Sequence, residues 1–531
     1  MAVKNGTPAG RRDWRRRMSL ASALVWMGAM AGVLVATVVF LVHRGGVRRE
    51  VDTRLKAART LAQRDNPAPL RQALTELDAL FTLDAEARDA QALAADVNLR
   101  LWLEHQQAEA QLPTREHLRR AEALDSRSGE RYGTRARLLV AEGKPEEAAR
   151  YLADLKAQGA KNPKLALAEA QTLQALGRLS EARQAFARAS EGAWREPRYA
   201  VAHGEALLDE GQYAQGAEAL KKALQANPEH LRARLSLALA RLYQGTGQDE
   251  ARQTVDAVLA DAAELTPGLR ARALVVRAAL ALEDGRMDDA LKDTAGALTA
   301  SPEEHHALFL RARLLAIKRD RGAREAFREA VAHRRTAPLL YLDGARALQQ
   351  AGDGEGALAL LDAYATVFQG VQLPAAEGTT VSALERDDRY WLARGQVLEA
   401  LTRPEDALAA YDRALGIRGL SQTRAQYAKA SLLLARKDYA AARPLLVAVA
   451  PENGSGALPE AYEALGELHF AQGEFANGCQ QYFIGLTRAR LQGASLEGLK
   501  TKAAGVEQRL VAAGQPSMSK AWRAEAESLL R

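Results

Sequence analysis

The stretch GEALLDEGQYAQGAEALKKALQANPEH, residues 204–230, places two small residues, Gly204 and Gly216, twelve positions apart. Pro228 follows after twelve more, and Gly211 lies between the two small residues. Equivalent glycines recur at a constant interval of 34 residues, at Gly143, Gly177, Gly211 and Gly245. A fixed period of this length is typical of a repeat architecture, so the glycines mark one unit of an array and not a ligand loop.

About ten such units can be aligned between residues 129 and 485. In each unit a larger side chain follows the second small residue by four positions, and a small one often follows three further on, as at Leu220 and Ala223. Offsets of four and three lie on one face of an α-helix. Each unit is therefore expected to be two antiparallel helices, with the small residues at their closest approach. Such pairs bury their faces only by stacking into a solenoid.

The pattern resembles the tetratricopeptide repeat family. The best matches are YAVAHGEALLDEGQYAQGAEALKKALQANP, RYWLARGQVLEALTRPEDALAAYDRALG and AYEALGELHFAQGEFANGCQQYFIGL, which begin at Tyr199, Arg389 and Ala461. The resemblance implies an all-α fold, a right-handed superhelical solenoid whose concave face is lined by the first helix of each pair. It also implies a scaffold that binds other proteins. The weak apolar position at Thr294 and the missing turn glycine near Arg319 depart from the family pattern.

The whole chain of 531 residues divides into five regions on this basis. The regions are a basic tail (1–17), a transmembrane helix (18–42), a linker with divergent helical repeats (43–128), the repeat solenoid (129–490) and C-terminal capping helices (491–531). The period slips by some 16 residues in the segment 366–388, where Val and Phe look exposed among Gly and Pro. This insertion is either a contact for a partner or a tolerated loop.

The N-terminus predicts a membrane anchor. Met18–Val42 contains no charged residue over 25 positions, which exceeds the roughly 20 residues needed to span a bilayer core. A cleaved signal peptide is the alternative, but the apolar run is longer than usual for one. Residues 1–49 hold nine Lys and Arg against one acid, whereas the rest holds 64 against 65. The basic tail favours a cytoplasmic N-terminus and a periplasmic solenoid at the inner membrane. The near-neutral body argues against nucleic-acid binding.

Within the anchor, small residues recur at intervals of four, at Gly28, Gly32 and Ala36. Such a stripe lets two membrane helices approach closely, so a homodimer through this face is one hypothesis. Glycine and alanine are also common in membrane helices without any role in pairing. Replacing Gly28 and Gly32 by Ile should abolish crosslinked dimers if the helices pair through this face.

A row of cations follows the second position of the repeat. This basic row comprises Lys164, Arg198, Arg232, Arg272, His306, Arg389 and Arg424. Cations at a helix start oppose the helix dipole, so local stability does not explain them. One interpretation is a groove that docks an acidic or extended partner segment. The other is that these residues pair with acids of neighbouring units. Deeper in the repeats a mixed set of polar residues suggests a polar groove: Arg137, Gln171, Glu205, Arg313, Arg346, Gln396 and Glu467.

No catalytic, cofactor or metal motif is recognisable. The histidines are scattered, and the adjacent pair His305–His306 is expected to point its rings about 100° apart on a helix. The single cysteine, Cys479, neighbours a packing glycine, where an inert thiol is expected. An enzyme is therefore not expected, and no cofactor is implied.

The sequence predicts an anchored repeat scaffold that binds protein components of a bacterial envelope complex. Three alternatives remain: an assembly or quality-control factor that faces the cytoplasm, a self-assembling structural subunit, and an envelope enzyme. A fusion reporter at the C-terminus, sedimentation of the soluble part and an activity assay would discriminate them.

Overall fold

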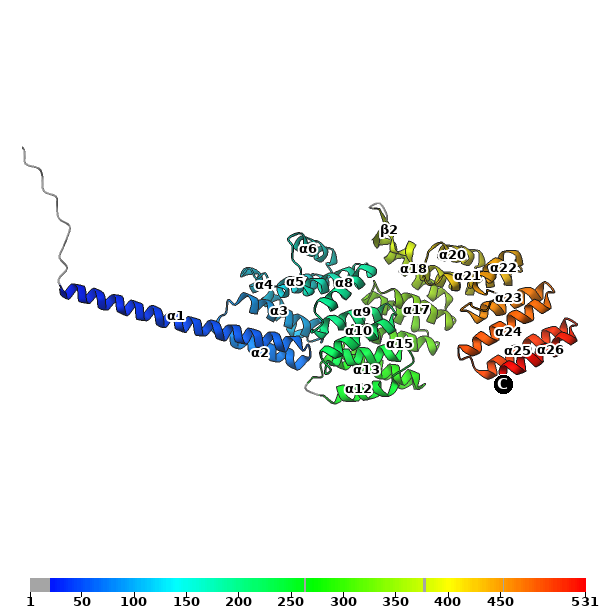
Figure 1. Cartoon of the computed structure of the whole chain (residues 1–531), viewed down its shortest axis with the longest axis horizontal. Helices are drawn as coiled ribbons and strands as arrows, with labels where there is room; N and C mark the ends of the chain where they lie inside the picture. Colours follow the sequence, from blue (N-terminus) through cyan, green and yellow to red (C-terminus); the bar gives the residue numbers. More distant parts are fainter. Residues whose placement is uncertain (1–19, 262–263, 376–378, 452) are drawn as a thin grey trace, which may run out of the picture.

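A computed structural model describes residues 20–261, 264–375, 379–451 and 453–531. The basic tail 1–17 lies outside the described residues. The structure is a continuous array of helices, and its order confirms the expected all-α solenoid (Figure 1). The strands it contains form a single two-stranded hairpin among the described residues.

The N-terminal region contains four α-helices and one short 3-10 turn. These are α1 (Leu20–Gln63), α2 (Pro67–Leu83), α3 (Arg88–Leu103), η1 (Ala108–Ala110) and α4 (Gln111–Ala123). Ten antiparallel pairs follow. They are α5 (Gly129–Ala141) with α6 (Pro145–Ala157), α7 (Pro163–Ala175) with α8 (Leu179–Gly192), α9 (Pro197–Asp209) with α10 (Tyr213–Ala226), α11 (Leu231–Leu242) with α12 (Gln248–Ala260), α13 (Pro267–Glu283) with α14 (Met287–Ala300), α15 (His305–Ile317) with α16 (Ala323–His333), α17 (Pro338–Gln350) with α18 (Gly354–Gly370), α19 (Asp388–Ala400) with α20 (Pro404–Gly416), α21 (Gln422–Ala435) with α22 (Tyr439–Val449), and α23 (Pro459–Ala471) with α24 (Phe475–Leu491).

The array ends in one further pair, α25 (Leu496–Ala512) and α26 (Pro516–Leu530). Trp522 of α26 is buried and donates its indole N–H to the Ala503 carbonyl at 2.8 Å. Because the indole fills the space between the two helices, it joins them as a unit packed on α24.

The turn inside each pair requires a left-handed backbone. Seven of the ten pairs have a glycine of positive φ at this turn, and Gly211 has φ of 76°. The seven are Gly143, Gly177, Gly211, Gly245, Gly285, Gly352 and Gly473. In three repeats a residue other than glycine takes this conformation, at Arg319, Thr402 and Lys437. The missing glycine near Arg319 therefore changes the residue type but not the shape of the turn, although such residues adopt this conformation at some cost.

Small residues mark the closest approach of the two helices, as the repeat pattern predicts. A Cβ added at Gly204 would lie 2.6 Å from Leu220, and the Gly216 carbonyl is 3.1 Å away. Prolines open many of the helices at their first position, where no intrahelical N–H is needed, as at Pro163 and Pro197. The small residues set the distance between the two helices of each pair, and the prolines mark where the next helix begins.

The helix α1 extends over 44 residues, about 66 Å, with no break where the membrane segment ends. Residues 43–63, which the sequence analysis placed in a linker, continue this helix, and its C-terminal part packs on α2. Among the described residues α1 is the one helix long and apolar enough to span a membrane, with mean hydropathy 2.4 and none of that window buried. The anchor segment would therefore be joined directly to the first packed helices.

The repeats wind so tightly that successive turns touch. Asn66 donates to the Glu229 carbonyl at 2.7 Å, the Gly268 N–H donates to the His105 carbonyl at 3.3 Å, and Thr336 donates to the Gln174 carbonyl at 2.9 Å. The residues in the first and last of these pairs are 163 and 162 positions apart, a little under five repeats of 34 residues. We call the part from α2 to α18 the N-terminal coil.

From α19 to α26 the helices pack mainly on their neighbours in the chain, and we call this part the C-terminal arm. It extends away from the coil in Figure 1. The two parts share the same repeat but differ in whether a second turn of the solenoid covers the inner face.

The insertion 366–388 differs from the sequence-based expectation of an exposed loop. The helix α18 runs on to Gly370, and Phe368 is buried against Tyr341 and Tyr364, because it lies four residues after Tyr364 on the same helix face. An antiparallel hairpin follows, β1 (Gln372–Pro374) and β2 (Thr380–Ser382), and then the 3-10 turn η3 (Ala383–Arg386). Val371 at the start of this segment approaches Gly177 in the preceding turn of the solenoid.

Candidate functional site

The predicted basic row is brought to the inner side of the solenoid, but most of it faces acids of the same chain. The pairs are Lys164 with Glu130 (2.5 Å), Arg198 with Asp96 (3.1 Å), Arg232 with Glu104 (3.1 Å) and with Glu205, Arg272 with Glu205, and His306 with Asp209 (3.8 Å). Arg389 pairs with Asp387 at 3.0 Å, and Arg424 is exposed without an ion pair among the described residues. Pairing with acids of neighbouring units, the second interpretation of the row, describes Lys164 and Arg232. Arg198 and Arg272 instead meet acids of more distant units, and Arg389 meets an acid two positions before it.

Two of the acids that meet the row, Asp96 and Glu104, come from the N-terminal region of the chain. Asp96 of α3 lies 102 positions before Arg198, and Glu104, just after α3, lies 128 positions before Arg232. Arg100, only 2 % exposed, pairs with Asp96 and lies 3.3 Å from Asp65. Buried cations must be paired, so the inner face of the coil folds only around this N-terminal segment.

Electrostatics fix the protonation states of this network at neutral pH. Burial alone would raise the pKa of Asp96, but Arg100 and Arg198 hold it well below its usual range. Burial likewise opposes the charge on Glu205, yet Arg232 and Arg272 lower the pKa of that carboxyl to about 2. The carboxylates stay charged, and each is matched by arginine.

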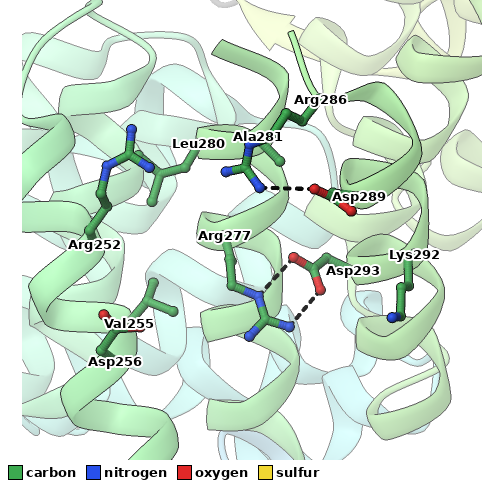
Figure 2. A pocket seen from close by; sticks show the side chains of 10 residues that line it. All are labelled: Arg252, Val255, Asp256, Arg277, Leu280, Ala281, Arg286, Asp289, Lys292 and Asp293. Atoms are coloured by element: carbon green, nitrogen blue, oxygen red, sulfur yellow. Dashed lines mark hydrogen bonds and ion pairs between the residues drawn. The ribbon is translucent and has the colours of Figure 1, made fainter. Parts of the chain in front are cut away.

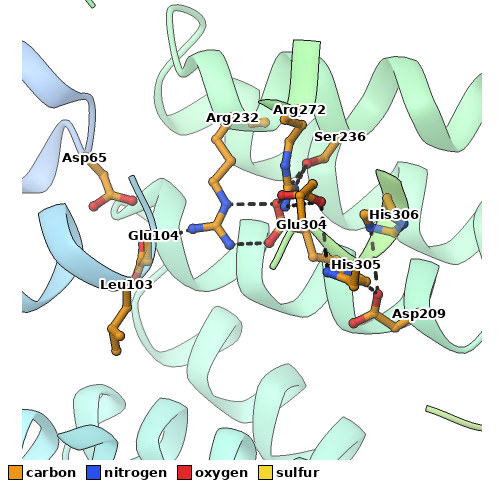
Figure 3. A network of polar contacts seen from close by, with 12 residues as sticks. Asp65, Leu103, Glu104, Asp209, Arg232, Ser236, Arg272, Glu304, His305 and His306 are labelled. Carbon is orange, nitrogen blue, oxygen red and sulfur yellow. Dashed lines mark hydrogen bonds and ion pairs between the residues drawn. The ribbon is translucent and has the colours of Figure 1, made fainter. Parts of the chain in front are cut away.

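Figure 3 shows how the network continues along the inner face. Ser236 donates to Glu205 at 2.8 Å and accepts from Arg272 at 2.9 Å. Glu304 lies 4.0 Å from Arg272 and begins the turn into α15. Beyond it, His305 and His306 face Asp209 of α9. Burial lowers the pKa of His306 to about 3, with the neighbouring His305 adding to the effect, so the imidazole is neutral.

This cluster corrects the expectation for the two adjacent histidines. Their rings do not diverge but lie with centroids 4.0 Å apart and planes 38° apart. They come together because His305 opens α15 next to the C-terminal end of α9, and both rings turn toward Asp209. Asp209 lies 96 positions before His305, so no local spacing in the sequence could have indicated this proximity.

An open groove lies on the inner face of the coil and reaches α19 of the C-terminal arm. One cavity of about 440 Å³ continues into another of about 710 Å³, since both are lined by Arg346 and Gln350. We call this surface the open groove, and its lining includes Tyr213, Tyr243, Arg313, Asp343, Arg346, Gln350, Gln396 and Glu399. Three of these, Arg313, Arg346 and Gln396, belong to the deeper polar set of the sequence analysis.

Arg313 distinguishes the open groove from the rest of the inner face. Its side chain is half-buried, and it forms no hydrogen bond or ion pair within the part of the chain that the structure describes. Its guanidinium lies 6.0 Å from the Phe309 ring. The nearby Tyr213 and Tyr243 rings pack at 4.9 Å between centroids. The groove therefore offers, beside aromatic surface, a cation that Asp343 attracts but that forms no direct ion pair within the described residues.

A further cavity of about 350 Å³ lies between α12, α13 and α14 and is lined by many charges (Figure 2). Its arginines are already matched: Arg252 pairs with Asp284 at 2.9 Å, Arg277 with Asp293 at 2.6 Å and Arg286 with Asp289 at 2.9 Å. Because these pairs neutralise the cavity, its charges do not favour a ligand of one sign.

The remaining predicted residues occupy open or half-open positions. In α1, an added Cβ at Gly28 or Gly32 would meet nothing within 4 Å, and Ala36 is exposed, so this face is free to contact another helix. Cys479 is half-buried, and burial raises the pKa of its thiol. The thiol is therefore a poor nucleophile at neutral pH.

Two segments of the chain match models of the tetratricopeptide repeat, at residues 207–274 and 392–457. Among solved structures, human IFIT1 bound to PPP-AAAA is 18% identical over 76% of this chain and 91% of that one, with a TM-score of 0.43. The Cut9–Hcn1 complex of the APC/C is 12% identical over 83% and 94%, with a TM-score of 0.40. A comparison with curated proteins gives no significant match. The two matched segments therefore contain tetratricopeptide repeats, and the ten stacked helix pairs form an all-α solenoid around them.

Proposed function

We propose that the protein is a membrane-anchored scaffold that holds partner proteins in the open groove. Proteins of this family generally act through protein contacts, and the solenoid here presents one inner surface that its own chain does not fill. The observation that carries the proposal is the unpaired Arg313, because the other inner arginines of the coil are matched by intramolecular acids.

The anchor supports the membrane location in this proposal. The exposed apolar part of α1 contains many large side chains, including Trp26, Leu34 and Phe40, each more than half exposed. Exposed apolar surface of this extent on one helix is unfavourable in water and favours a bilayer. The basic tail before it favours a cytoplasmic N-terminus, which would place the solenoid in the periplasm of a bacterial envelope.

The groove suggests a polar mode of binding. Arg346 is exposed and pairs with Asp343 at 3.0 Å, and Gln349 donates to the Gln396 carbonyl at 3.1 Å. These exposed interactions are weak, so the groups can exchange them for contacts with a partner at little cost in free energy. An extended protein segment with polar side chains fits this lining better than a lipid or an apolar small molecule.

In-cell crosslinking of the full chain, followed by mass spectrometry, tests the proposal. We expect the double change Arg313→Glu and Arg346→Glu to lose specific envelope proteins from the crosslinked set. Arg328→Glu is the matched control, because Arg328 is 58% exposed on α16 and pairs only with the adjacent Glu325. The groove assignment would be wrong if the double variant still crosslinked the same proteins while the Arg328→Glu control lost them.

Topology is tested separately with a reporter at the C-terminus. Activity of a reporter that folds only outside the inner membrane supports the periplasmic solenoid. Activity of a cytoplasmic reporter would instead support the alternative in which the scaffold faces the cytoplasm.

A further inference from the structure

Three potential metal ligands from two helices converge inside the coil (Figure 3). The Asp209 Oδ1 atom lies 3.0 Å from Nε2 of His305 and 3.8 Å from Nε2 of His306. One ligand atom from each of the three residues lies within 4.8 Å of the others. Ligands bonded at about 2.0–2.2 Å to a single ion have separations of this order.

We propose that Asp209, His305 and His306 form a binding site for a borderline divalent metal ion of the zinc class. Two imidazole nitrogens and one carboxylate oxygen suit such an ion, and three protein ligands leave a fourth position for water.

Glu304 provides an independent indication. Its Oε1 atom is buried without a hydrogen-bond partner and lies 3.9 Å from Nδ1 of His305. Histidines that bind metals usually donate the other ring N–H to a carboxylate, which fixes the tautomer. A small rotation would let His305 donate from Nδ1 to Glu304, and its Nε2 lone pair would then face the metal position.

Arg334 is the residue that competes with the metal. Its guanidinium donates to Oδ2 of Asp209 at 2.6 Å, while Oδ1 of Asp209 accepts from Nε2 of His305 at 3.0 Å. A metal ion would replace this histidine–aspartate hydrogen bond, with the imidazole proton moved to Nδ1. The other terminal nitrogen of Arg334 lies 3.0 Å from Nε2 and 3.3 Å from Nδ1 of His305, so it is not directed at the Nε2 lone pair alone. The side chain is 30% exposed and extends from the end of α16, from where it can turn toward solvent.

The site would join two repeats that are distant in the chain. Asp209 is the last residue of α9 and the two histidines are the first residues of α15, and helices α10 to α14 lie between them in the chain. An ion held by both helices binds the folded coil and not the unfolded chain, so it raises the melting temperature of the coil. The proposed scaffold function does not depend on this tie.

The test uses the full chain in detergent micelles, stripped with a chelator and dialysed against Zn²⁺. We expect one zinc ion per chain by elemental analysis and a higher melting temperature with zinc. His306→Ala is expected to weaken zinc binding at least tenfold. His203→Ala is the matched control, since His203 is a half-buried histidine elsewhere on α9 and should leave binding unchanged.

A second variant keeps the test decisive if His306→Ala fails to fold. Arg334→Gln removes the competing cation and is expected to strengthen zinc binding severalfold, with Co²⁺ giving the visible absorption of a tetrahedral nitrogen and oxygen site. Absence of bound zinc in both the natural chain and Arg334→Gln overturns the proposal. Equal binding by a folded His306→Ala chain also overturns it.

Discussion

The N-terminal coil and the C-terminal arm use the same repeat but treat the inner face differently. In the first repeats of the coil, the N-terminal helices cover the inner face, and cations such as Arg198 and Arg232 are matched by acids more than 100 positions away. In the arm, helices pack mainly on their chain neighbours, and Arg424 at the equivalent position is exposed. The role of a repeat position therefore depends on what the solenoid brings opposite it.

The largest expected difference in stability comes from removing one ion-paired arginine in each region. Arg100→Ala removes an ion-pair partner of both Asp65 and Asp96 in a buried network. We expect the unfolding free energy of the coil to fall by about 3–5 kcal/mol. Arg436→Ala breaks a 3.1 Å pair with Glu405 in the arm whose side chains are 42% and 74% exposed, and should cost under about 1 kcal/mol. Denaturant unfolding, with amide hydrogen exchange to resolve the coil from the arm, measures both changes in unfolding free energy. Similar losses of stability in the two variants would contradict the difference between the regions.

Acid should weaken the coil before the arm. Burial lowers the pKa of His105 from 6.5 to about 4, although the facing Asp65 and Glu104 oppose the shift and Arg232 and His230 add to it. The unfolded chain binds more protons between these values, so stability falls as the pH drops from about 6.5 to about 4. Glu205, with its pKa lowered from 4.5 to about 2, adds a loss between those two values.

Melting curves of the full chain at pH 7, 5.5 and 4.5 check this expectation. His105→Gln should flatten the dependence between pH 6.5 and 4.5 while leaving the arm unchanged. A coil transition that is independent of pH in this range would contradict the assignment of a neutral, buried His105.

Packing glycines give a smaller contrast within the arm itself. A Cβ at Gly395 would lie 2.3 Å from the Tyr411 ring, so Gly395→Ala should cost about 1–3 kcal/mol by overpacking. Gly505 lies inside α25 with nothing within 4 Å, so Gly505→Ala should stabilise by about 0.5–1 kcal/mol. Thermal denaturation of the two variants would reveal opposite signs, and destabilisation by both would count against the packing account.

The smallest effect on stability is expected in the apolar part of α1. Gly28→Ile with Gly32→Ile should leave the melting of the solenoid unchanged and abolish crosslinked dimers if α1 pairs through its small residues. Val35→Ile, on an exposed position of the same helix, is the control. Dimers that persist in the double variant would show that this face is not the contact.

The fold was predictable because its determinants are local. The positive φ of Gly211 and the close approach at Gly204 each follow from one residue repeated at a fixed period. The partners of the basic row were not predictable, because Asp96 and Glu104 lie in a region of degraded periodicity and meet the row only through winding of the solenoid. The burial of Phe368 was not predicted because α18 runs to Gly370, beyond the length of the second helix in the 34-residue repeat. The repeat pattern therefore gives no position for this residue.

Hydrogen exchange of the full chain in detergent micelles at neutral pH tests the central claim most directly. Because buried ion pairs join α3, α9, α11 and α13 on the inner face of the coil, we expect amides of these helices to exchange only with opening of the whole coil. Amides of α21 to α26 should exchange through smaller, independent openings. Uniform exchange across both regions, or slower exchange in the arm, would contradict the account.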